Sequence, residues 1–137
     1  MHDLLKDIGI NIKGIINLSA KEAYSICEKG AIILDVRKNT MNQYKVFDVN
    51  EVIYCPYNTI IENISLLPID KLLIIADAVG LHSKEILITL KENGFENIAN
   101  LAGGIVDWER DGLPIKIDKS FELNGACVCR LRPHYKN

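Results

Sequence analysis

Two short segments made almost entirely of apolar residues constrain the fold of this chain more than any other feature. Residues 31–36 read AIILDV and residues 72–76 read LLIIA, and each is bounded by glycine or charged residues. A strand with one face in water alternates apolar and polar residues, whereas these segments have apolar residues on both faces. They predict strands of a parallel sheet that helices cover on both sides.

Segments with helical features separate the predicted strands. Residues 19–22 (SAKE) form a capping-box sequence, which begins a helix that Gly30 ends. Residues 60–67 carry apolar side chains at helical spacing and predict a second helix. Ser83 is expected to cap a third helix that runs to Asn93.

The alternation of strands and helices predicts an α/β fold. Residues 37–50 are polar and predict a loop. In parallel sheets, sites form in the loops beyond the carboxyl ends of the strands. The loops that follow Val36 and Ala76 are therefore the two candidate regions. Shorter strands are expected at residues 15–18, 52–55 and 98–101.

Composition and charge exclude several classes of protein. Hydrophobic residues make up 48% of the chain and charged residues 25%, as in ordinary globular domains. A net charge of −2 does not favour a nucleic-acid or membrane-surface binder. No apolar run has the length of a membrane span, and residues 1–14 lack a signal-peptide pattern. We expect a cytoplasmic protein with reduced cysteines and no cofactor.

The charge is distributed unevenly along the chain. Residues 116–137 hold five basic residues against two acidic ones. The chain is therefore predicted to consist of an N-terminal segment (1–14), a domain (15–115) and a basic C-terminal tail (116–137).

The loop before the helix at Ser83 is the segment best suited to hold an anion. A strand, a loop and a capped helix direct backbone N–H groups at one spot. A cysteine at the first loop position would become a reactive thiolate, but that position is Asp77. The Asp77 carboxylate can serve as a structural cap or mark a ligand-binding loop. The candidate binding loop comprises Asp77, Ala78, Val79, Gly80, Leu81, His82 and Ser83.

Four segments, in order and spacing, resemble the rhodanese-like domain family. They are residues 34–37 (LDVR), 55–57 (CPY), 77–83 (DAVGLHS, similar to the family's C-x-x-G-x-R-S) and 101–114 (LAGG, a Trp and GLP). The resemblance covers about residues 15–115. It implies a rhodanese-like α/β fold with an about five-stranded parallel sheet flanked by helices on both faces. For members with an intact site, it implies sulfur transfer from thiosulfate or a persulfide donor through a cysteine persulfide.

The sequence departs from the family pattern at the site. Asp77 stands where the family places its catalytic cysteine, and His82 stands where arginine is frequent. A carboxylate cannot form a persulfide. Gln43 stands where a glutamate usually pairs with the arginine of LDVR, so Arg37 needs another partner.

Three functions follow from these departures. The leading prediction is a rhodanese-like protein that has lost sulfurtransferase activity in the loop and binds a ligand or partner through it. The partner is an unidentified protein, or a small anion or sulfur compound, and the chain can form a homodimer. The alternative is a sulfurtransferase or persulfide relay that uses Cys127 or Cys129 of the tail. The third is a metal or redox module built on the tail.

The tail and the remaining polar residues leave alternatives open. Basic neighbours are expected to lower the thiol pKa of Cys127 and Cys129, and His134 is a possible third metal ligand, with the fourth missing unless a second chain supplies it. At the rim of the sheet, Asp35 and Arg37 either brace each other or contribute to a site. His82 either pairs with Asp77 in a pH-sensitive ion pair or is a solvated loop histidine. Cys27 and Cys55 are expected in the core.

Overall fold

The computed structural model describes residues 4–38 and 45–117. The strands are β1 (Ile10–Ile12), β2 (Ile15–Leu18), β3 (Ile32–Asp35), β4 (Lys45–Phe47), β5 (Val52–Tyr54), β6 (Leu73–Ala76), β7 (Ile98–Leu101) and β8 (Ile115–Ile117). The helices are α1 (Ala20–Cys27), α2 (Ile60–Asn63), α3 (Ser83–Glu92) and α4 (Gly104–Arg110), with 3₁₀ turns η1 (Tyr57–Thr59) and η2 (Ile64–Leu66).

The main sheet has the order β1-β2-β7-β6-β3-β5. Strands β2, β7, β6, β3 and β5 run parallel, and only β1 pairs antiparallel, with β2. The predicted parallel α/β fold is therefore confirmed. The two apolar segments form β3 and β6, which pair with each other inside the sheet and are buried throughout.

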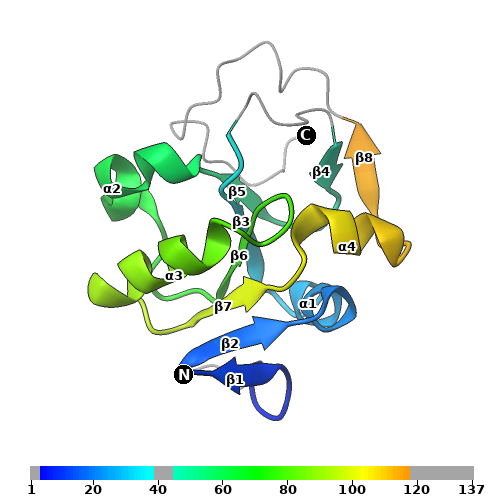
Figure 1. Ribbon diagram of the computed structural model, residues 1–137, viewed down its shortest axis with the longest axis horizontal. Coiled ribbons are helices and arrows are strands. Elements are labelled where there is room, and N and C mark those ends of the chain that lie inside the picture. The colour runs from blue at the N-terminus through cyan, green and yellow to red at the C-terminus, as the bar shows by residue number, and fades with distance from the viewer. Residues whose placement is uncertain (1–3, 39–44, 118–137) are drawn as a thin grey trace.

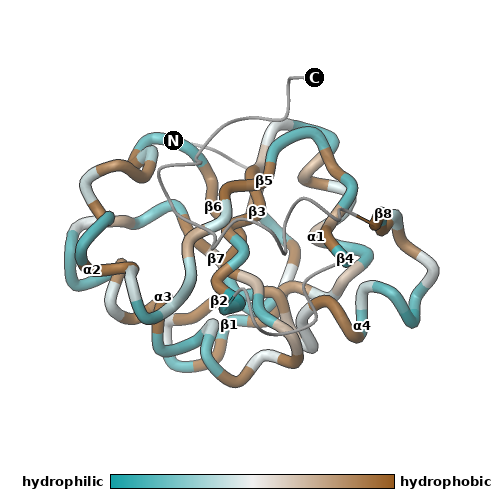
Figure 2. The backbone as a smooth tube through the Cα atoms, turned by 90° about the horizontal axis from the view of Figure 1, so that it is seen from above, coloured by the Kyte–Doolittle hydropathy of each residue, from teal (hydrophilic) through white to brown (hydrophobic). Residues whose placement is uncertain are grey.

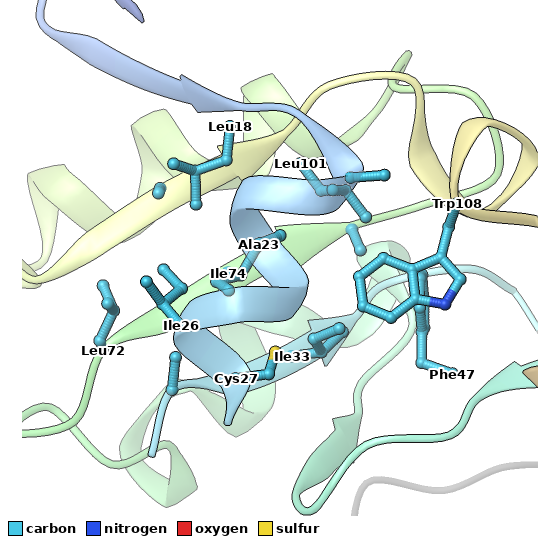
Figure 3. Close-up of a cluster of buried hydrophobic side chains, with 14 of the residues drawn as sticks. Leu18, Ala23, Ile26, Cys27, Ile33, Phe47, Leu72, Ile74, Leu101 and Trp108 are labelled. Atoms are coloured by element: carbon cyan, nitrogen blue, oxygen red, sulfur yellow. The ribbon is translucent and has the colours of Figure 1, made fainter. Parts of the chain in front are cut away.

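Helices cover both faces of this sheet (Figure 1). Side chains alternate between the faces along each strand, so Ile33 packs into one hydrophobic cluster and Leu34 into the other. Figure 3 shows the cluster under α1, where Trp108 lies beside Phe47. The two rings meet edge to face, with centroids 5.0 Å apart. Hydrophobic segments run through the centre of the fold at β3 and β6 (Figure 2).

The capping box at the start of α1 is confirmed. The Glu22 N–H donates to Ser19 Oγ at 3.1 Å, and the Ser19 N–H donates to Glu22 Oε1 at 2.9 Å. These bonds satisfy two N–H groups that the first turn of a helix leaves without a partner. These reciprocal bonds lower the pKa of Glu22, chiefly through the Ser19 N–H.

One predicted element differs from the structure because a distant partner decides its conformation. The predicted loop at 37–50 contains β4, whose partner β8 lies far along the chain. Residues 10–12 form β1, which pairs with β2, the next strand in the chain.

The second predicted helix is broken into shorter turns. Only residues 60–63 are α-helical, and 3₁₀ turns lie on either side. Thr59 Oγ1 donates to the carbonyl of Pro56 at 3.0 Å, and Asn63 Nδ2 donates to the carbonyl of Thr59 at 3.0 Å. Such side-chain bonds to backbone compete with a regular helix.

Candidate functional site

The predicted binding loop lies beyond the carboxyl end of β6, and Asp77 is buried at its base with 3% of its surface exposed. Its Oδ1 accepts the N–H of Gly80. Its Oδ2 accepts the N–H of His82 at 2.6 Å and that of Ser83 at 3.2 Å. The carboxylate thus occupies the spot at which these loop N–H groups converge. These bonds provide a buried anion with the donors it requires.

The loop is fastened to the start of α4. The carbonyl of Asp77 accepts the N–H of Ile105 at 2.9 Å, and the carbonyl of Ala78 accepts the N–H of Val106 at 3.1 Å. Gly104 makes this approach possible, because a Cβ there would lie 2.4 Å from both carbonyl oxygens. Its φ of +60° also favours glycine. The Gly-Gly pair of the family-like motif therefore has a structural role under the loop.

Ser83 does not cap α3, so that prediction is wrong. The N-cap residue is His82, whose side chain makes no capping bond. The Asp77 carboxylate accepts the N–H groups of His82 and Ser83, which are the N-cap and the first residue of α3. The Ser83 hydroxyl instead donates to Asn100 Oδ1 at 2.5 Å.

The bond from Ser83 continues as a polar chain across the sheet. Asn100 on β7 is buried, and its Nδ2 donates to Asn17 Oδ1 on β2 at 2.8 Å. This series of hydrogen bonds was not predicted from the sequence. An asparagine inside an otherwise apolar strand was the available signal, because a buried amide requires partners.

The rim residues Asp35 and Arg37 form a buried ion pair. Arg37 Nη2 lies 2.8 Å from Asp35 Oδ2, and Arg37 Nε lies 3.0 Å from Asp35 Oδ1. Nη2 also donates to the carbonyl of Lys45 on β4 at 2.8 Å. Arg37 therefore braces β3 against the β4–β8 pair. Gln43, which departs from the family pattern, lies outside the described residues.

The pKa of Arg37, at the rim, responds to the charges of both Asp35 and Asp77. Burial acts to lower the pKa of the Arg37 guanidinium, but the charge and hydrogen bonds of Asp35 outweigh it and raise the pKa above its ordinary value. The charge of Asp77 acts in the same direction. The strand register explains why the charge of Asp77 reaches Arg37. In the β3–β6 pair, Asp35 lies opposite Ala76, the residue before Asp77.

The His82 ring lies against Tyr57. The ring centroids are 4.0 Å apart and the planes are 8° from parallel. Lys38 Nζ lies 5.9 Å from the centroid of the Tyr57 ring. Among the described residues no ion pair joins the His82 ring to Asp77, since the His82 bond to that carboxylate comes from the backbone.

The two described cysteines lie in the core, as predicted. Cys27 and Cys55 are at most 1% exposed, and neither belongs to the loop. Burial raises the pKa of Cys27 to about 12 and also raises the pKa of Cys55. Both thiols are therefore protonated near neutral pH and are poor nucleophiles.

The tail residues Cys127, Cys129 and His134, with the metal ligation suggested for them, lie outside the described residues. Within residues 4–38 and 45–117, no group of His, Cys, Asp or Glu is arranged to hold a metal ion. No helix in the same ranges combines the length and hydrophobicity that crossing a bilayer requires.

Comparisons with known proteins agree with this architecture. The model of the rhodanese-like domain family matches residues 19–111. A thiosulfate sulfurtransferase GlpE of Haemophilus influenzae is 26% identical over 98 residues, which cover 72% of this chain and 91% of that protein. The chain belongs to the rhodanese-like domain family, as its motifs indicate.

Solved structures show the same fold. A rhodanese-related protein of Thermoplasma volcanium is 25% identical with a TM-score of 0.68, and the match covers 74% of this chain and 98% of that one. A rhodanese-like domain protein of Staphylococcus aureus is 24% identical with a TM-score of 0.63, covering 73% and 97%. An NAD-dependent persulfide reductase of A. fulgidus is 30% identical with a TM-score of 0.53, covering 74% of this chain and 16% of that one.

Proposed function

We propose that this rhodanese-like protein does not transfer sulfur through its loop and instead binds a ligand or partner there. The observation that carries the proposal is the Asp77 carboxylate, which accepts the N–H groups of Gly80, His82 and Ser83. The loop holds an anion that is part of the chain itself. A rhodanese-like scaffold with this loop is suited to recognition rather than to turnover.

The chemistry of the family supports this interpretation. Sulfur transfer from thiosulfate requires a thiolate that attacks the outer sulfur, so that a persulfide forms and sulfite leaves with the electron pair of the broken S–S bond. The Asp77 carboxylate cannot form a persulfide. Its charge also repels an approaching anion, and its oxygens already take three N–H donors of the loop.

A sulfurtransferase assay tests the proposal. Wild-type protein incubated with thiosulfate and cyanide is expected to produce no thiocyanate. Because backbone N–H groups also stabilise a thiolate, Asp77→Cys is expected to gain a persulfide, detected as one added sulfur atom in the intact mass. Thiocyanate production by the wild type would overturn the proposal. Asp77→Ala is the matched control, since it removes the carboxylate without supplying a thiol.

The tail relay is the second candidate, and the end of β8 favours it. Ile117 pairs with Lys45, whose carbonyl accepts Arg37 Nη2 at the rim beside the loop. Cys127 follows Ile117 by ten residues, which span at most about 33–36 Å when extended. A tail that leaves the fold here has the length to bring a thiol to the loop.

The tail cysteines can be tested separately from the loop. If the relay operates, the wild type produces thiocyanate, and Cys127→Ser or Cys129→Ser abolishes it. Cys27→Ser is a suitable control, because this thiol is buried in the hydrophobic core. A wild type that is inactive with thiosulfate and does not take up sulfur on either tail cysteine rules the relay out.

A further inference from the structure

The outer side of the loop carries a small apolar patch, which we define as Val79, Leu81 and Val106. Leu81 is 74% exposed and Val79 is 50% exposed. Val106, on the first turn of α4, is 47% exposed, and its N–H donates to the carbonyl of Ala78. The patch therefore joins the loop and α4 above the buried Asp77.

The patch is held in place before any partner arrives. The Asp77 carboxylate fixes the loop from within, and the bonds from Ile105 and Val106 fix it to α4. A preorganised surface loses little conformational freedom on binding, so a small apolar contact gives more affinity there than on a mobile loop. The Tyr57–His82 ring stack lies next to Leu81 in the chain and extends the platform.

Two lysines lie around the patch, one partly buried and one exposed. Lys38 lies over the Tyr57 ring, and Lys84 is exposed on the first turn of α3. Within the described residues neither lysine forms an ion pair. Glu85 is exposed beside Lys84 and partly offsets it.

The other acidic groups near the patch are already compensated. Asp77 accepts loop N–H groups, and Asp35 pairs with Arg37. On α4, Asp107 pairs with Arg110 at 2.8 Å. The face thus combines apolar side chains with two lysines that form no ion pair among the described residues.

We propose that this face docks an extended segment of a partner protein that combines Asp or Glu with apolar side chains. The inference rests on the proposed function, since it identifies the kind of partner that the loop receives. The apolar side chains of the segment contact Leu81 and Val79, and its carboxylates lie near Lys38 and Lys84. Charge complementarity selects the partner, and the apolar contact holds it.

An anionic membrane offers similar chemistry, but the structure favours a peptide. Two lysines near a bilayer contribute only about 1 kcal/mol each, and the patch has just three apolar side chains to insert.

Selection from random linear peptides displayed on phage tests the proposal with the full chain. Peptides are panned on the wild type and counter-selected on Leu81→Ser, a change that leaves folding intact because the side chain is exposed. We expect enrichment of sequences that combine Asp or Glu with Leu, Ile, Val or Phe. A synthetic peptide of that composition should bind about tenfold more weakly to Leu81→Ser and to Lys84→Glu.

Matched variants make the result specific to the patch. Ile61→Ser removes another well-exposed apolar side chain, outside the patch, and Lys71→Glu reverses an exposed charge elsewhere. Both are expected to bind the peptide as the wild type does. Replacing the acidic residues of the peptide by lysine should abolish binding.

Other outcomes overturn the inference. One is the enrichment of basic or uncharged peptides, and another is enrichment that does not depend on Leu81. A third is Leu81-dependent binding to phosphatidylserine vesicles in place of peptides. The proposed function fails separately, since only sulfur transfer by the wild type refutes it. An inactive wild type that selects uncharged peptides refutes the docking inference alone.

Discussion

Two buried aspartates lie at the same edge of the sheet but are held in different ways. Asp35 ends β3 and pairs with the guanidinium of Arg37. Asp77 follows β6, the neighbouring strand, and accepts backbone N–H groups of its own loop. Asp35 also accepts the backbone N–H of Arg37 at 3.2 Å, but its charge is compensated by one particular side chain, whereas the loop hydrogen bonds of Asp77 depend only on the path of the main chain.

This difference indicates which of the two positions can change its chemistry. Replacing Arg37 removes the partner of Asp35, because no backbone group supplies an equivalent charge. The N–H groups around Asp77 remain whichever residue follows β6, provided that the loop keeps its path over α4. The N–H groups of such a loop can stabilise either a carboxylate or a thiolate at position 77. At the rim, the buried carboxylate of Asp35 requires the guanidinium of Arg37.

Loss of the rim ion pair is expected to have the largest effect. Arg37→Ala leaves the Asp35 carboxylate buried and uncompensated, which costs about 3–5 kcal/mol in the free energy of unfolding. Urea unfolding followed by circular dichroism measures the change. Arg110→Ala, at an exposed pair, is the control and should cost less than about 1 kcal/mol. A loss below about 1 kcal/mol for Arg37→Ala would show that the rim is not held by this pair.

Removal of the loop carboxylate should have the next largest effect. Asp77→Ala leaves the buried N–H of Ser83 and its neighbours without an acceptor, at a cost of about 2–3 kcal/mol in unfolding free energy. Asp77→Asn keeps an acceptor oxygen and should lose less than Asp77→Ala. If Asp77→Ala is as stable as the wild type, the loop does not depend on its carboxylate and the contrast with the rim disappears.

The hydrogen bonds that join Ser83, Asn100 and Asn17 behind the loop are expected to contribute less to stability. Ser83→Ala leaves the buried Oδ1 of Asn100 without its hydroxyl donor and should cost about 1–2 kcal/mol in the same unfolding assay. Ser25→Ala is the control, because the Ser25 hydroxyl bonds to the Glu22 carbonyl at the surface. Equal effects of the two substitutions would contradict a structural role for the chain.

The surface ion pair beside the rim is expected to matter least. Lys45 Nζ lies 3.0 Å from Glu109 Oε2, and both side chains are well exposed. Lys45→Ala should cost about 0.2–1 kcal/mol at low salt and less as salt rises. Unfolding at two salt concentrations measures this. A large, salt-independent loss would place this pair with the buried rim pair and remove the distinction between them.

The parts of the fold that the sequence predicted correctly are those that local patterns define. AIILDV and LLIIA predicted β3 and β6 because apolar residues on both faces of a strand require cover on both faces. The capping box predicted α1 because its partners lie within one turn. The position of the loop followed from the same reasoning, since sites in parallel sheets form at the carboxyl ends of strands.

The errors concern elements whose conformation depends on contacts that hydropathy does not specify. Strand β4 lies in a largely polar segment that resembles a loop, and its pairing with β8 decides its conformation. Ser83 resembles a helix cap in sequence, but it is the first residue of α3 and its N–H donates to Asp77. The hydroxyl of Ser83 is then available to Asn100, which is 17 residues away.

The sequence alone determined the class of fold and the place of the candidate site, because hydropathy and short motifs act over a few residues. It also determined that a carboxylate, and not a thiol, follows β6. Only the tertiary structure decided that this carboxylate turns inward onto the N–H groups of its own loop and that the Gly104 region supports the loop from below. Hydrogen-bond partners depend on how the chain closes in space, and no local pattern specifies that path.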